Sequence, residues 1–274
     1  MFDKDVRTEA IPERIFELAR IVELYASNEK ALSKEELKGL FIQEELCIGT
    51  TNYFTPVFEA GQELRIISLE DNIVKFTGKK ELLKSLMQFR KFCNMTLFNN
   101  KESQFYQLIA CFLNANDEWF KYGSFTTSDE IQKILNQATG IPTLTLKKDV
   151  VLAIRFWISF LGFGYVQEKQ KIFLPNMYTA LKDFIVSGNI ETKKEYSVRE
   201  FFRNVHQGIQ VALGNSVQTM KLNLALSNAL RLLHDEKEII LKNNLDSEEV
   251  WHLFPNEEHI FTSDITHIIV LEVK

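Results

Sequence analysis

Apolar residues recur with a helical period near the start of the chain. They follow one another at intervals of four, three, four and three residues: Ile11, Ile15, Leu18, Val22 and Tyr25. This spacing places them on one face of an amphipathic helix. Ser33 and Glu36 have the spacing of a capping box, which predicts that a second helix begins just after Ser33. Thr55 and Pro56 open or re-phase a third predicted helix, which runs to about Leu64.

A β-hairpin is predicted directly after the third helix. Ile66 and Ile67 are apolar and β-branched, residues 68–72 (SLEDN) have the composition of a turn, and residues 73–76 (IVKF) are typical of a returning strand. Three helices followed by a two-stranded hairpin is the order of elements in a winged helix-turn-helix unit.

The middle of the chain repeats this order. The elements predicted there are a helix around 105–112, a short helix from Ser128, a longer helix over 147–161, a hairpin of 163–166 and 172–174, and a connecting helix over 177–185. Gly162 is suited to end the long helix, because glycine adopts the left-handed conformation common at helix C-termini. A second winged-helix unit is therefore expected.

The last part of the chain contains the pattern once more. Its predicted elements are a capping box at 197–200, a helix over 222–234, a wing made by strands 239–241 and 250–253, and a final apolar strand over 266–273. The predicted fold class is mainly α with small β-hairpins, as two or three tandem winged helix-turn-helix units. The expected boundaries are 1–95, 96–190 and, for a possible third unit with the C-terminal strand, 191–274.

Three helix-to-wing junctions carry a resemblance to a known family. The segments are FEAGQELRIISLEDNIVKFT, FWISFLGFGYVQEKQKIFLPN and LSNALRLLHDEKEIILKN. In these segments, and in length, the chain resembles tandem winged-helix proteins, in particular the DpdG family of bacterial deazapurine DNA-modification and restriction islands. The resemblance implies a component of an antiviral DNA-defence system that works beside ATPase or nuclease subunits. It supplies no catalytic residues.

Charge changes this picture. The 274-residue chain has a net charge of −5, whereas a free-standing DNA-binding protein is usually basic. Eight acids and two lysines lie between Asp235 and Glu258, but one stretch, 75–91, has six basic residues against one acid. We therefore expect double-stranded DNA to contact this stretch through its phosphates, together with two lysines before the long central helix. The candidate nucleic-acid-binding residues are Lys75, Lys79, Lys80, Lys84, Arg90, Lys91, Lys147 and Lys148.

Other interpretations of these residues stay open. The stretch 75–91 is also typical of a solvated amphipathic helix that turns Leu82, Leu83, Leu86 and Phe89 inward. The helices expected to enter a groove are weak readers of bases: the first carries Glu59 and Glu63 without a basic residue, the second is apolar apart from Lys147, Lys148 and Arg155, and the third offers Asn223, Asn228 and Arg231. Packing or protein contact is the alternative use of their exposed faces.

Aromatic and metal-ligating residues suggest further chemistry. Six aromatic side chains suit either base stacking or, given 22 phenylalanines, packing: Tyr53, Phe54, Trp119, Phe120, Tyr122 and Phe125. His252 and His259 lie near Glu257 and Glu258, where either a divalent metal or an exposed turn is compatible with the spacing. Asp264, Glu272 and Lys274 are similar to the core of PD-(D/E)xK nucleases, in which two carboxylates hold Mg²⁺.

Three functions of different classes follow. The leading hypothesis is a non-catalytic, DNA-associated accessory subunit of a defence or genome-maintenance complex. The alternatives are a protein–protein adaptor, such as the winged-helix subunits of SMC-like ATPase complexes, and a metal-dependent nuclease using the C-terminal Glu-x-Lys. No NTPase, hydrolase or kinase signature occurs, so we expect no enzyme, no cofactor and no metal. A second copy of the chain is a further candidate partner.

The expected compartment is the cytoplasm. The charged N-terminal segment has no apolar signal core, and the most hydrophobic stretch, 150–166, is interrupted by Arg155 and is too short to span a membrane. Cys47, Cys93 and Cys111 match no zinc pattern, and their odd number suits reduced thiols.

Overall fold

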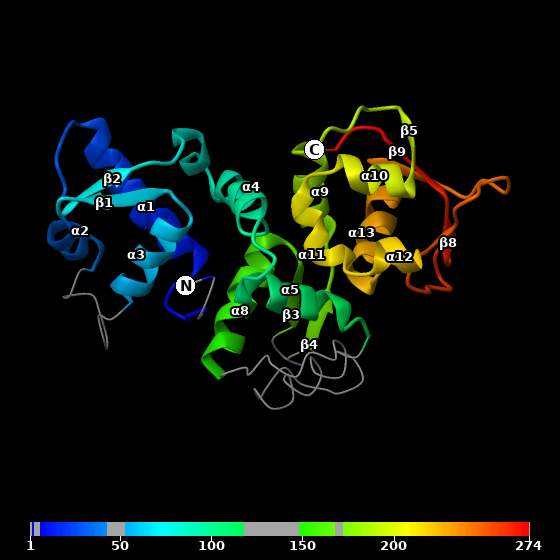
Figure 1. The fold of residues 1–274 in the computed structure, drawn as a ribbon, viewed down its shortest axis with the longest axis horizontal. Helices are drawn as coiled ribbons and strands as arrows, with labels where there is room; N and C mark the ends of the chain where they lie inside the picture. The colour runs from blue at the N-terminus through cyan, green and yellow to red at the C-terminus, as the bar shows by residue number, and fades with distance from the viewer. Residues whose placement is uncertain (1, 3–5, 43–52, 118–147, 168–171, 274) are drawn as a thin grey trace.

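A computed structural model describes residues 2, 6–42, 53–117, 148–167 and 172–273 (Figure 1). About half of these residues are helical, and the strands form small antiparallel sheets. The fold class predicted from the sequence, mainly α with small β-hairpins, is therefore confirmed; the number of winged-helix units stays a prediction. The chain runs from α1–α3 at one end, through α4, α5 and α8 in the middle, to α9–α13 at the other end (Figure 1).

The first part has the predicted order. Its elements are α1 (Pro12–Ser27), α2 (Lys34–Phe41), α3 (Phe54–Glu63), β1 (Ile67–Glu70) and β2 (Ile73–Phe76). The capping box of α2 is present, because Ser33 accepts a hydrogen bond from the Glu36 amide while the Glu36 carboxylate accepts one from the Ser33 amide. The hairpin turn is shorter than expected, since pairing extends to Glu70 and Ile73 and only Asp71 and Asn72 take positive φ angles.

In the described residues of the middle part, the elements are a 3₁₀ turn, three helices and the second hairpin. They are η2 (Lys80–Leu83), α4 (Leu86–Thr96), α5 (Gln104–Asn114), α8 (Lys148–Leu161), β3 (Gly164–Gln167) and β4 (Ile172–Pro175). Gly162 ends α8 with a φ of 78°, as predicted. The short helix predicted from Ser128 lies outside the described residues.

The last part is built around α13, the helix predicted over 222–234. Its elements are α9 (Tyr178–Val186), β5 (Glu195–Ser197), α10 (Val198–Asn204), η3 (Gln207–Ile209), α11 (Gln210–Leu213), α12 (Ser216–Thr219), α13 (Leu224–Asp235), β6 (Ile239–Lys242), β7 (Trp251–His252), β8 (Asp264–Ile265) and β9 (His267–Val270). The capping box at Ser197 and Glu200 is present and begins α10.

The predicted wing of the last part is wrong. Strand β6 pairs with β9, with Ile239 opposite Val270, rather than with residues 250–253. Strand β9 also pairs with β5, so the sheet order is β5-β9-β6, while β7 pairs with β8. The reason is side-chain burial: alternate residues of β6 and β9 are buried and form one continuous apolar face. The segment between these two strands leaves the sheet.

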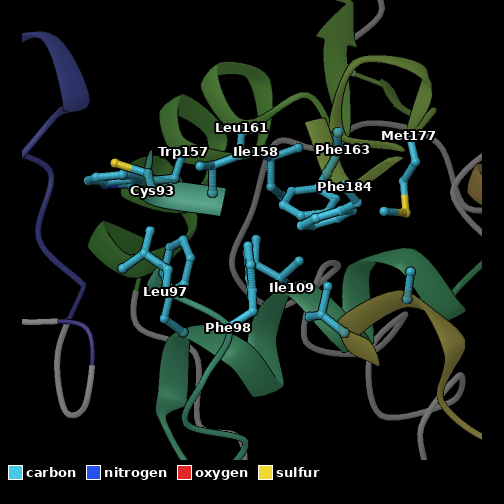
Figure 2. Close-up of a cluster of buried hydrophobic side chains, with 14 of the residues drawn as sticks. Cys93, Leu97, Phe98, Ile109, Trp157, Ile158, Leu161, Phe163, Met177 and Phe184 are labelled. Carbon is cyan, nitrogen blue, oxygen red and sulfur yellow. The ribbon is translucent and has the colours of Figure 1, made fainter. Parts of the chain in front are cut away.

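One continuous core joins the parts. Trp157, Phe163 and Phe184 are fully buried and bring α8 and α9 together, with Cys93 of α4 and Ile109 of α5 beside them (Figure 2). The indole of Trp157 also donates a hydrogen bond to the carbonyl of Ala10, 3.0 Å away, which ties α8 to the segment before α1. Helix α4 itself spans residue 95, the expected end of the first unit, and contacts both α8 and α9.

Candidate nucleic-acid interface

The basic run, defined here as Lys75, Lys79, Lys80, Lys84, Arg90 and Lys91, does not lie on one element. Lys75 is in β2, Lys80 is in η2, and Arg90 and Lys91 are in α4. A serine, Ser85, separates η2 from α4 because its side chain accepts a hydrogen bond from the Gln88 amide and caps the new helix. The run is therefore divided between a strand, a 3₁₀ turn and a helix.

Two of these lysines form ion pairs with acids of the first part of the molecule. Lys75 forms an ion pair with Glu70 across the β1–β2 hairpin, and this hydrogen bond raises the pKa of Lys75. The Lys80 ammonium lies 2.9 Å from the Glu23 carboxylate of α1. A hydrogen bond from Ser27, then one from Lys80, lowers the pKa of Glu23. Both lysines remain largely exposed, so their ion pairs are weak.

Arg90 has a different environment. Its Nε and Nη2 atoms donate to the two carboxylate oxygens of Asp183 in α9, at 2.9 and 3.0 Å. The Asn94 amide donates to the same carboxylate at 2.9 Å and to the Leu161 carbonyl at 3.1 Å. Asp183 is 1% exposed. Arg90 therefore connects α4 to α9, and its guanidinium is bound to Asp183 rather than free to contact an anion.

Three members of the basic run have no counterion in the part of the chain that the structure describes. Among the described residues, Lys79, Lys84 and Lys91 form no ion pair and no side-chain hydrogen bond. Lys79 and Lys84 are exposed, whereas Lys91 is half-buried. The positive charge available to an anion in this stretch therefore comes from these three side chains.

A shallow groove runs between α1 and η2. It has a volume of about 440 Å³ and is lined by Glu17, Arg20, Ile21, Glu23, Leu24, Lys80, Leu83 and Lys84. We call it the α1–η2 groove. Three of its lining side chains are apolar, namely Ile21, Leu24 and Leu83, and Leu24 is 58% exposed. Arg20 pairs with Glu17 and Lys80 with Glu23, so Lys84 is the one unpaired charge among these lining residues.

Sequence reasoning missed this groove, although one signal was present. Leu24 lies outside the apolar stripe of the first predicted helix, next to Tyr25. A leucine on the polar side of an amphipathic helix is an exposed apolar side chain. Leu86 was expected to point inward, which is wrong: it is 42% exposed in the first turn of α4, whereas Leu82 and Phe89 are buried as predicted. The Ser85 cap restarts the helix and shifts its phase.

The helices expected to read bases are poorly suited to a DNA groove. The exposed side of α3 carries Glu59, Gln62 and Glu63, and the Glu63 carboxylate accepts a hydrogen bond from the Phe2 amide at 2.6 Å. Helix α13 is buried along most of its length, and both its residue Arg231 and its N-cap residue Asn223 are buried. Lys148 begins α8, and Lys147 lies outside the described residues.

The other candidate chemistry is also placed. Phe54 is 3% exposed, so it packs in the core. The guanidinium carbon of Arg14 lies over the Tyr53 ring, 4.7 Å from the ring centroid. Trp119, Phe120, Tyr122 and Phe125 lie outside the described residues. Cys93 and Cys111 are buried, and burial raises the pKa of Cys93. Cys47 lies outside the described residues.

The histidines and C-terminal carboxylates have separate partners. His252 contacts Asp264 at 2.9 Å, and His259 contacts Asp235 at 3.0 Å. Glu272 follows β9 and is exposed, while Lys274 lies outside the described residues. Within the described ranges, no group of three or more His, Cys, Asp or Glu side chains is placed to hold a metal ion. Nor does any helix in those ranges have the length and apolar character needed to cross a membrane.

Comparison of the chain with protein-family models, with curated proteins and with solved structures found no match.

Proposed function

We propose that this protein is a non-catalytic accessory subunit that binds another protein through the α1–η2 groove. The observation that carries the proposal is the groove itself, in which three apolar side chains, one of them largely exposed, lie among two ion pairs. Exposed apolar surface bordered by polar side chains is typical of protein–protein contact. A phosphate-binding surface would instead present several unpaired cations and little exposed aliphatic surface.

The helices that were expected to read bases also favour a protein partner over DNA. An acidic α3 repels phosphates, and α13 is covered along most of its length. Of the three hypotheses from the sequence, the adaptor is therefore favoured over the DNA-associated subunit and the nuclease. That the partner is an ATPase or nuclease of a DNA-defence system stays a prediction from the family resemblance.

The groove defines the chemistry of its partner. Ile21, Leu24 and Leu83 suit the apolar stripe of an amphipathic helix, since such helices bury residues three and four apart in a groove. Lys84 suits a carboxylate beside that stripe, because it is the unpaired charge of the groove lining. The expected partner element is an amphipathic helix with an acidic flank.

Site-specific photo-cross-linking tests this proposal. A photoreactive amino acid is placed at position 24 or 83 of the full chain in cells that naturally produce it, with position 193, on an exposed turn elsewhere, as control. We expect the same protein to be cross-linked from 24 and 83, not from 193, and to be lost with Lys84→Glu. Equal cross-linking from all three positions, or none from the groove positions, contradicts the proposal.

DNA contact is the second candidate function, because Lys79, Lys84 and Lys91 carry no counterion among the described residues. If these lysines bind phosphates, affinity for duplex DNA falls steeply with salt. The triple change Lys79→Glu, Lys84→Glu and Lys91→Glu then abolishes binding in a fluorescence anisotropy titration at low salt. The control is a triple change of Lys30, Lys193 and Lys237 to Glu, which alters net charge equally on other surfaces. DNA binding lost equally in both triple variants rejects this candidate.

A further inference from the structure

A second concave site lies far along the chain from the α1–η2 groove. This cavity, of about 830 Å³, is bordered by α5 on one side and by α12, the start of α13 and β7 on the other. Figure 1 shows α5 and α12 near one another across this region. Cavities that bind organic ligands occupy about 300–1,000 Å³. The volume is therefore suited to an organic molecule and much larger than a single small ion requires.

Hydrogen bonds hold the walls of this cavity in place. Asn223 accepts from the Leu226 amide at 2.9 Å and donates to the Ala212 carbonyl at 2.7 Å. On the β7 side, the His252 amide donates to the Met220 carbonyl at 2.7 Å, and the Leu222 amide donates to the His252 carbonyl at 2.8 Å. A ligand would therefore meet a preformed surface, which reduces the ordering cost of binding.

The lining of the cavity is biased toward positive charge. Among the described residues, Lys101, Lys221 and His252 line it and no Asp or Glu does, although the chain contains 37 acidic residues against 32 Lys and Arg. Neither lysine forms an ion pair or a side-chain hydrogen bond with the described residues. Asp264, an acid that directly follows the lining residue Ser263, is already bonded to His252 at 2.9 Å and to Ser263 at 2.8 Å. The cavity is thus suited to an anion.

Apolar and aromatic surface lies beside these cations. Tyr106 and Phe254 are half-buried rings in the lining, and Leu222 and Leu253 contribute aliphatic surface. Gln107 and Asn215 are exposed amides that can donate and accept hydrogen bonds. A bare inorganic anion would leave the rings and amides unused. A molecule that joins a phosphate to a planar polar ring would use all three kinds of surface.

We propose that this cavity binds a nucleotide-sized organic phosphate, with Lys101 and Lys221 contacting the phosphate and the rings of Tyr106 and Phe254 contacting the base. The function is separate from partner binding, because the cavity and the α1–η2 groove share no residue. A bound ligand would contact both α5 and residues 221–223, which directly precede α13.

Isothermal titration calorimetry of the full chain tests the proposal with four nucleoside monophosphates (AMP, GMP, CMP and UMP), with the matching nucleosides, and with inorganic phosphate. At least one monophosphate is expected to bind about tenfold or more tightly than its nucleoside and than phosphate, a difference that corresponds to about 1.4 kcal/mol. Equal affinity for phosphate, equal affinity for the nucleoside, or no binding of any monophosphate overturns the proposal.

Matched variants locate the site. Lys101→Glu with Lys221→Glu is expected to weaken monophosphate binding about tenfold or more, because two attractive charges become repulsive. Lys30→Glu with Lys193→Glu, two exposed lysines away from the cavity, is expected to leave it unchanged. All four lysines are exposed, so folding is preserved. Equal weakening by both pairs shows a net-charge effect and rejects the site.

Discussion

Two features of position 162, its backbone conformation and its close neighbours, favour glycine over any amino acid with a side chain. Its φ of 78° lies in the left-handed region, and a Cβ atom added there would lie 2.6 Å from Cβ of Thr179 in α9. Gly39 in α2 is the opposite case, because a Cβ added there meets nothing within 4 Å. The same substitution at the two positions therefore separates strain from helix propensity.

Gly162→Ala is expected to lower the free energy of unfolding by about 1–3 kcal/mol, because alanine is strained at this φ and clashes with Thr179. Gly39→Ala is expected to raise it by up to about 1 kcal/mol, since alanine is the better helix former. Urea unfolding followed by circular dichroism measures both. A Gly162→Ala protein as stable as the wild type would show that α8 can end without the left-handed residue.

Sequence reasoning located the basic residues but not their partners. The composition of 75–91 identifies a positive stretch, yet whether a cation there already has a counterion depends on acids far away in the chain. Glu23 is 57 positions before Lys80, and Asp183 is 93 positions after Arg90. Nothing local in the sequence distinguishes Arg90, committed to Asp183, from Lys84, which has no counterion among the described residues. Pairing of this kind is set by helix packing, which a linear pattern does not encode.

Among the elements, α13 is nearly enclosed, and Arg231 explains part of that burial. This side chain is 3% exposed. Its Nη2 atom donates to the carbonyls of Phe254 and Thr262, each at 2.8 Å, and its Nε atom donates to that of Phe261 at 3.0 Å. Burial lowers the pKa of its guanidinium. Arg231 therefore holds the segment between β7 and β8 against the helix.

Arg231→Met is expected to loosen residues 254–262, because methionine fills similar space but leaves three carbonyls without their donor. We expect faster amide hydrogen exchange confined to this segment, and a loss of about 2 kcal/mol or more of unfolding free energy. Arg20→Met, which changes an exposed arginine of α1, is the control and should leave exchange unchanged. Unaltered exchange in 254–262 would show that packing alone holds the segment.

The strand pairings show where local sequence patterns predict the structure correctly and where they do not. The first two hairpins join strands separated by two and four residues, and both were predicted from the sequence. The third joins Lys242 to His267 across a segment that itself contains two short strands. Trp251 was a plausible strand residue, but its partner is Ile265. Proximity in sequence therefore favoured the wrong pairing, since long-range register depends on burial that only the folded chain reveals.

At the scale of the whole molecule, Arg90 and Asp183 join the middle part of the chain to the end that contains α9–α13. Arg90 is in α4 and Asp183 in α9, and Asn94 contributes a further hydrogen bond to the same carboxylate. A buried carboxylate with such partners is costly to leave unpaired. This joint therefore predicts that the middle part and the end that contains α9–α13 unfold together rather than independently.

Three variants test this joint. Asp183→Leu and Arg90→Met are each expected to cost about 3 kcal/mol of unfolding free energy, because each leaves a partly or fully buried charge unpaired. The double variant should recover most of that loss, since two apolar side chains replace both charges and still pack between α4 and α9. Lys194→Ala, which breaks an exposed pair with Glu191, serves as the surface control and should not alter stability. Urea unfolding with both near-ultraviolet and far-ultraviolet detection measures these differences, and coincident curves for the wild type are expected. If the losses in the two single variants simply add in the double variant, packing rather than charge pairing holds the joint. If the wild-type curves already separate, the middle part and the α9–α13 end unfold independently.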